Sequence, residues 1–151
     1  MSDRWLVVAH RAGARIFSIQ DHGRSLRLVE DLDHPRGRLH DGAIDADRPG
    51  RAYDSVGGGR HAMEREEGAS ERDAADFARV VAARLEQGRV EHACDAIVLV
   101  AEPRFLGLLR ATLDRPTAAL VRASLDKDLA HLAATDLAAQ LGEVLQPAQP
   151  H

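Results

Sequence analysis

The chain has 151 residues, a formal net charge of −4 and a single cysteine, Cys94. This length fits one domain with a sizeable core, and one cysteine excludes both an internal disulfide and a cysteine-based zinc site. The acidic balance argues against polyanion binding over the whole surface but leaves room for a local basic patch. No apolar run approaches the ~20 residues of a membrane span, and residues 1–11 lack a signal-peptide pattern, so we expect a cytoplasmic protein without a membrane partner.

Three strands are predicted in the first 33 residues. They correspond to the apolar or alternating runs at residues 5–9, 15–19 and 26–32. Turn signals separate them, first at Gly13 and then at Asp21-His22-Gly23. Because both turns are short, the three strands are expected to form an antiparallel meander.

Residues 34–70 show no sustained apolar periodicity and hold seven of the twelve glycines. Long segments of this kind are usually functional or disordered, so we expect a flexible loop at 34–70. Its three successive glycines, Gly57, Gly58 and Gly59, allow close backbone approach to a ligand. Neither a Walker pattern nor a dinucleotide-binding pattern surrounds them. A flexible tether and a loop that enters a partner's site both remain open.

The second half of the chain alternates helix and strand. Ser70 as N-cap begins a predicted helix that ends at Gly88, and the unbroken apolar run at 94–101 predicts a central strand covered on both faces. There follow a helix from Pro103 that stops at 114–116, a strand at 118–123, a helix at 127–145 and a frayed tail at 147–151. The order β-β-β, long glycine-rich loop, α-β-α-β-α indicates an α/β protein with a mixed sheet and helices on its faces, in a single domain at residues 1–146.

Few residues are spaced for chemistry. Ser55 lies near Asp54 and His61, but no G-x-S-x-G elbow surrounds it, and the loop histidines lack metal-site spacing. Cys94 opens a buried strand and is expected to be an inert small hydrophobe. Glu102 and Arg104 follow the central strand, at the sheet edge where ligands often bind, so they could contact a ligand. They could equally well be a helix cap and the arginine that pairs with it.

Arginines in the loop could make local phosphate contacts. Residues 34–72 hold seven arginines and eight acidic residues, so the net charge of this segment is −1. Strong non-specific nucleic-acid binding needs an excess of basic side chains. Contacts would therefore be local, through Arg51, Arg60 and Arg65, and a solvated mixture of charges is the alternative.

Several strings resemble a known family along nearly the whole chain. The strings WLVVA with ARIF, PGR with DS, GRHA, PRFLGLL and DKDL are similar to those of the bacterial host attachment proteins. That family is itself similar to the middle domain of archaeal and eukaryotic peptide-release factors. The resemblance implies an RNase H-like sheet with a glycine loop before a long helix.

The resemblance also implies a role in translation, although the sequence departs from the release-factor motif at the loop tip. Release factors carry Gly-Gly-Gln at the loop tip, and here Gly59 or Arg60 takes the glutamine position, followed by an acidic stretch at 64–71. We therefore expect a ribosome- or tRNA-associated factor without glutamine-dependent hydrolysis of peptidyl-tRNA and without a cofactor. The expected contact residues are Arg51, Asp54, Ser55, Gly57, Gly58, Gly59, Arg60, His61 and Arg65.

Two other functions stay open. The first is an interaction or regulatory protein needed for attachment to host cells, with no role in translation. The second is a hydrolase that uses His61, Asp54 and Glu64, although nothing in their spacing is specific.

Overall fold

A five-stranded mixed sheet forms the centre of the protein. The computed structural model describes residues 3–34 and 59–146, with side chains for residues 3–34 and 71–146. The strands are β1 (Asp3–His10), β2 (Gly13–Gln20), β3 (Ser25–Asp33), β4 (Cys94–Ala101) and β5 (Val121–Leu125), in the order β3-β2-β1-β4-β5. β1, β2 and β3 pair antiparallel, whereas β4 runs parallel to β1 and β5 parallel to β4. The predicted meander and mixed sheet are confirmed; the RNase H-like assignment stays a prediction.

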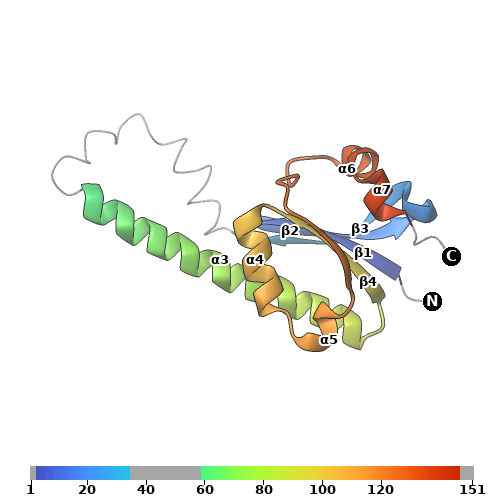
Figure 1. Cartoon of the computed structure of the whole chain (residues 1–151), viewed down its shortest axis with the longest axis horizontal. Helices are drawn as coiled ribbons and strands as arrows, with labels where there is room; N and C mark the ends of the chain where they lie inside the picture. The colour runs from blue at the N-terminus through green and yellow to red at the C-terminus, as the bar shows by residue number, and fades with distance from the viewer. Residues whose placement is uncertain (1–2, 35–58, 147–151) are drawn as a thin grey trace.

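Helices cover both faces of this sheet (Figure 1). α3 (Gly59–Val90) and α4 (Pro103–Thr112) pack on one face, and α6 (Ala134–Gln140) and α7 (Gly142–Leu145) pack on the other. The short η1 (Asp21–Gly23) joins β2 to β3, and α5 (Arg115–Ala118) precedes β5. Alternation along β1 divides the core, since Trp5 and Val7 belong to the α3 side while Leu6 and Val8 belong to the α6 side.

The predicted central strand is confirmed in type and bounds. β4 spans Cys94–Ala101 and lies between β1 and β5. Ile97 and Leu99 face the α3 side, and Val98 and Val100 face the α6 side. Because helices cover both faces of β4, side chains on either face are buried in apolar surroundings. This explains why the apolar run is unbroken and does not alternate with polar residues.

The predicted start of the long helix at Ser70 is wrong. α3 begins at Gly59, so residues 59–70 of the expected loop are helical. This stretch lacks an apolar face, which hides it from a periodicity argument, but it is rich in the strong helix formers Ala, Met, Glu and Arg. Helix growth onto an anchored helix avoids the unfavourable nucleation step. The predicted end at Gly88 is also two residues short, since α3 continues to Val90.

Two predictions near the carboxyl terminus need correction. The expected strand at 118–123 lies at Val121–Leu125, because Asp114 caps a short helix, α5, instead of only ending α4. The expected helix at 127–145 is replaced by an irregular stretch, then α6 and α7. The carbonyls of Ala130 and Leu132 accept hydrogen bonds from Arg15 Nη2, at 2.8 and 2.6 Å. Carbonyls used in this way favour an irregular path over a continuous helix.

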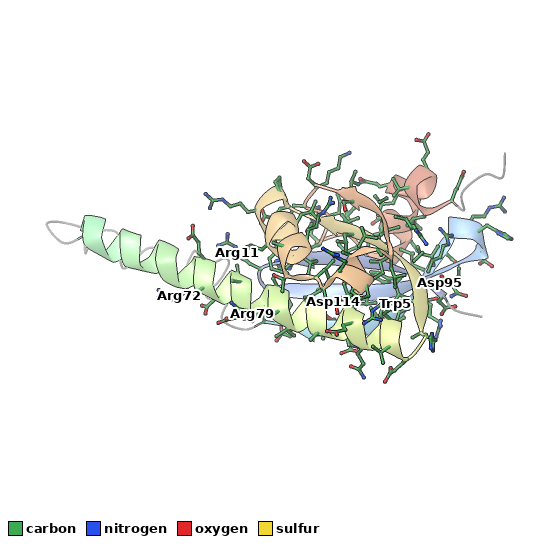
Figure 2. The ribbon with its side chains drawn as sticks, turned by 60° about the horizontal axis from the view of Figure 1, so that its bottom comes forward. Trp5, Arg11, Arg72, Arg79, Asp95 and Asp114 are labelled. Carbon is green, nitrogen blue, oxygen red and sulfur yellow. The ribbon has the colours of Figure 1, made fainter. Side chains whose placement is uncertain are left out.

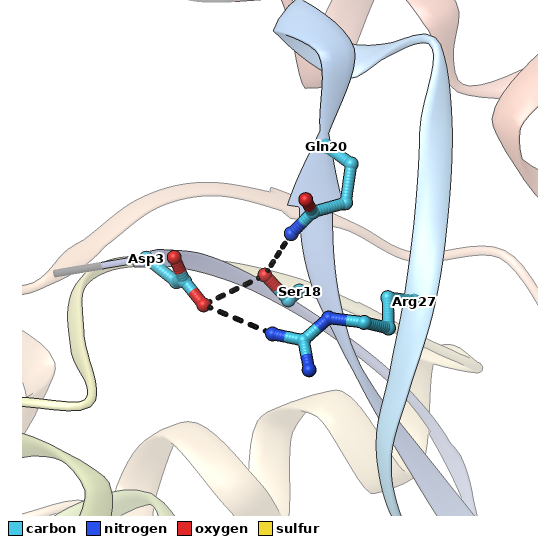
Figure 3. A network of polar contacts seen from close by, with 4 residues as sticks. All are labelled: Asp3, Ser18, Gln20 and Arg27. Carbon is cyan, nitrogen blue, oxygen red and sulfur yellow. Dashed lines mark hydrogen bonds and ion pairs between the residues drawn. The ribbon is translucent and has the colours of Figure 1, made fainter.

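A polar network around one buried hydroxyl joins β1, β2 and β3 at the end of the sheet where β1 begins (Figure 3). The hydroxyl of Ser18, which is fully buried, donates to Asp3 Oδ2 at 2.9 Å and accepts from Gln20 Nε2 at 2.6 Å. Arg27 Nη2 lies 3.5 Å from the same Asp3 oxygen. The network satisfies a polar group that would otherwise destabilise the core.

Candidate functional site

The structure places four of the predicted contact residues on one helix. Gly59, Arg60, His61 and Arg65 lie in the first two turns of α3. Positions 61 and 65 are four residues apart, so they share one side of the helix. The other predicted contact residues, Arg51, Asp54, Ser55, Gly57 and Gly58, lie outside the described residues.

The outer end of α3, residues 59–70, extends past the sheet and α4 (Figure 1). At 1.5 Å per residue these twelve residues span about 18 Å. Among the residues of α3 whose side chains are described, 71–90, Glu71 and Arg72 are exposed, and Asp73 and Ala74 are the first that are buried. In Figure 2 the turns before Arg72 leave the body of the molecule. α3 is therefore an anchored helix with a projecting end.

The anchored part of α3 is tightly held. Ala74, Phe77, Ala78, Val81 and Leu85 follow helical spacing, and all are buried against the sheet. This spacing confirms the predicted apolar face. Burial of such a stripe fixes the axis of the helix, so the direction in which the outer end projects is set by the core.

Arg84 and Trp5 add a second anchor nearer the end of α3. The Arg84 guanidinium lies 5.2 Å from the centroid of the Trp5 ring, and its Nε donates to Glu30 of β3. Gly88, one turn further on, lies directly against the same ring. Sequence patterns do not indicate this arrangement, because a glycine at position 88 is typical of a helix end.

His34 joins the end of β3 to α3. Its backbone N–H donates to the Ala12 carbonyl at 3.0 Å, and its ring stacks on Phe77 with centroids 4.7 Å apart. Within the described residues its Nε2 is buried without a hydrogen-bond partner. The chain therefore leaves β3 beside the anchored part of α3 and returns at the projecting tip of the same helix.

A hollow of about 240 Å³ lies at the edge of the sheet where β1 ends. Strand register brings polar side chains to it: Arg15 pairs with Asp31, and Gly13 pairs with both His10 and Asp33. His10 Nδ1 accepts the Ala12 N–H at 3.2 Å, which leaves Nε2 to carry the proton of the neutral ring. Sequence reasoning missed this group, because only the pairing of three strands brings its members together.

Glu102 is a helix cap. Its carboxylate accepts from the backbone N–H groups of Phe105 at 2.8 Å and Arg104 at 3.3 Å. Of the roles that the sequence left open, the cap is confirmed, whereas the described residues show no ion pair between Glu102 and Arg104. The cap stabilises the first turn of α4.

Two groups have shifted acidities. Burial raises the pKa of the Cys94 thiol to about 11, and the neighbouring Asp95 carboxylate adds to the rise. The thiol is therefore protonated at neutral pH, and the burial of Cys94 agrees with the predicted inert small hydrophobe. At the start of α5, the hydrogen bonds that Asp114 accepts from Thr117, side chain first and then backbone, lower the pKa of its carboxyl.

The described residues hold no group of three or more histidine, cysteine, aspartate or glutamate side chains that could hold a metal ion. Among the same residues, no helix is long and apolar enough to cross a membrane.

The fold and the site define the class of protein. It is an α/β protein with a five-stranded mixed sheet and one long helix that projects from it. A family model described as "Protein required for attachment to host cells" matches residues 5–141, and the chain belongs to this family, Host_attach. The match spans β1 to α6 and confirms the family resemblance; the similarity to release factors stays a prediction. No curated protein matches the chain.

Proposed function

We propose that this chain is an interaction protein whose contact element is the outer end of α3, with residues 51–58 before it. The observation that carries the proposal is the projection of α3 beyond the core that anchors it. A helix that is anchored at one end and projects at the other holds its outer end at a fixed angle to the sheet. A projecting helix end of this kind is suited to insertion into a concave site on a larger partner.

The partner we propose first is the ribosome or a tRNA. Support comes from the order of elements, in which Gly57 and Gly58 directly precede a helix of 32 residues that begins at Gly59. That order is what the resemblance to release factors implies. Arg51, Arg60 and Arg65 would supply local phosphate contacts through their guanidinium groups.

The charge balance of the outer end bears on the affinity of this contact. Residues 59–70 carry two arginines and three glutamates, which is a net charge of −1. The contact would therefore depend on shape and on a few arginines, and would weaken with salt only modestly. It would not need catalysis, since glutamine is absent from the position where release factors carry it.

Sedimentation tests the proposal. Tagged protein from gently lysed cells is run through a sucrose gradient at low and moderate salt, together with a Gly58→Val/Gly59→Val variant. We expect wild-type protein in the ribosomal fractions and the variant at the top. Gly142→Val serves as the control, because a Cβ at Gly142 meets nothing within 4 Å. Wild-type protein that stays at the top under both conditions would contradict the translation role.

The family description favours a second candidate, an attachment-related interaction or regulatory protein with no role in translation. The acidic net charge of −4 is compatible with a protein partner. In this case deletion of the gene lowers attachment of the cells, and the Gly58→Val/Gly59→Val variant fails to restore it although no ribosome association exists. Labelling of intact cells would then show whether the protein reaches the surface.

A further inference from the structure

A hollow of about 730 Å³ lies between α6 and the turn that joins β2 to β3. We call it the α6 hollow; its walls are α6, η1 and the first residues of β3. It lies on the sheet face that carries α6 and α7, where α6 packs beside β3 (Figure 1). Sites for small molecules have volumes of about 300–1,000 Å³, so this hollow is large enough to hold one.

The α6 wall of the hollow is made of small side chains. Leu137 and Leu141 of this helix are buried against the sheet, and the residues beside them face the hollow. Larger side chains there would fill the space, and a Cβ built on Gly142 meets nothing within 4 Å. The wall is therefore shallow and mostly apolar, with Leu26 of β3 next to it. Its members are Ala134, Thr135, Ala138, Ala139 and Gly142.

The opposite wall is cationic. Arg24 and His22 line it, and both side chains are exposed. Over residues 3–34 and 71–146, neither side chain forms a hydrogen bond or an ion pair. The guanidinium of Arg24 and a ring N–H of His22 are thus unused donors at the rim of the hollow.

Acidic residues border the hollow, but none of them lines it. Asp21 holds the turn, since its Oδ2 accepts from Ser25 Oγ at 2.9 Å. Asp136 lies two residues from both Ala134 and Ala138, about 200° away around the helix, so it faces away from the hollow. Glu143 lines a different hollow, on the far side of α7 from η1. The lining therefore carries the positive charge of Arg24 and no negative charge.

The turn that carries Arg24 is held in one conformation before any ligand binds. Asp21, His22 and Gly23 have φ values of 52°, 57° and 94°, all in the left-handed region. Residues other than glycine adopt this region where their surroundings enforce it. Here the Arg24 N–H donates to the Asp21 carbonyl at 3.2 Å, and Gly23 lies against the Leu145 carbonyl. A preorganised wall lowers the ordering cost of binding.

We propose that the α6 hollow binds a small organic phosphate that carries a planar ring, for which a nucleoside monophosphate is the probe. The paired N–H groups of Arg24 match two phosphate oxygens. The ring lies on the small side chains of α6, where only a thin group fits between the helix and Leu26. An apolar wall with a few convergent polar groups is typical of ligand sites. The inference goes beyond the proposed function, since α3 covers the other face of the sheet.

Isothermal titration calorimetry tests the inference on the full chain. The ligands are AMP and UMP, with adenosine and inorganic phosphate as the two halves of AMP. Arg24→Gln removes the charge and Ala138→Leu fills the hollow. The matched controls, Arg122→Gln on β5 and Ala83→Leu on α3, change exposed residues on other elements. Circular dichroism checks that each variant is folded.

We expect both nucleotides to bind the wild-type protein more tightly than either half of AMP does. Arg24→Gln should weaken binding about tenfold, because a hydrogen bond to a charged group is lost. Ala138→Leu should weaken it by about tenfold or more, and the controls should stay within about twofold of wild type. In NMR spectra, AMP should shift the amide resonances of Arg24 and Ala138 and leave that of Val80 on α3 unchanged.

Three results would overturn the inference. The first is no binding of either nucleotide at millimolar concentration. The second is binding that Ala138→Leu leaves unchanged or that the controls weaken equally. The third is inorganic phosphate or adenosine that binds as tightly as AMP, because one half of the ligand would then contribute nothing. Sedimentation with ribosomes is a separate measurement, so failure here leaves the proposed function standing, and the reverse also holds.

Discussion

Gly88 makes the sharpest prediction about how α3 is held. A Cβ built on Gly88 would lie 2.5 Å from Trp5 Cη2 and 2.6 Å from Trp5 Cζ3. The Trp5 side chain is 2% exposed, so its ring has no free space to enter. Gly88→Ala therefore forces two packed elements apart, even though alanine is the better helix former.

The size of the effect follows from two opposing terms. Overpacking of a core costs up to about 3 kcal/mol, and a contact of 2.5 Å, far inside van der Waals distance, belongs in the upper part of that range, at about 2–3 kcal/mol. Gly to Ala inside a helix contributes about 1 kcal/mol of stability in the opposite direction. We therefore expect a net loss of about 1–2 kcal/mol in the free energy of unfolding. For a chain of this size that lowers Tm by about 2–8 °C.

Gly107 supplies a matched control. It also lies within a helix, α4, but a Cβ there meets nothing within 4 Å. Gly107→Ala should raise the free energy of unfolding by about 0.5–1 kcal/mol, because only the propensity term acts. The same substitution thus has opposite signs at two helical glycines.

Urea unfolding measures both variants. Trp5 is the sole tryptophan, so its fluorescence reports the contact itself, and circular dichroism reports the helices. Trp5→Phe removes the ring atoms that a Cβ at Gly88 would meet. In that background, circular dichroism should show that Gly88→Ala loses about 1 kcal/mol less than in the wild type. A Gly88→Ala protein as stable as wild type would refute the reasoning.

Three further predictions concern the ends of elements and the buried thiol. Gly23 has φ +94° and a Cβ there would lie 2.5 Å from the Leu145 carbonyl oxygen, so Gly23→Ala should lower the free energy of unfolding by more than 1 kcal/mol, which urea unfolding measures. Glu102→Ala removes the cap of α4 and should lower it by about 1 kcal/mol, whereas Glu102→Asp should lower it less, by the same assay. Because burial raises the pKa of Cys94 from 9.0 to about 11, the thiol contribution to stability is present below pH 9 and falls as pH rises through 11. Unfolding of wild type and Cys94→Ala across this range measures the difference, which would be constant if the thiol titrated normally.

Local signals carried the prediction of most strands and of α4. The bounds of β4 follow from an apolar run with two buried faces, and Glu102 followed by Pro103 marks a helix start through the cap and the fixed φ of proline. Both signals act over a few residues. The first turns of α3 were not predicted because residues 59–70 show no apolar periodicity in the sequence.

The sequence by itself determined the family, the mixed α/β class and the anchored face of α3. Only the tertiary structure decided that Gly88 lies against the Trp5 ring and that α3 begins at Gly59 and projects past the sheet. The physical reason is the distance along the sequence between the residues that make contact. Strand register and the packing of helices on a sheet join residues far apart in the chain, and hydrophobic spacing within one segment cannot specify which segment will lie beside it.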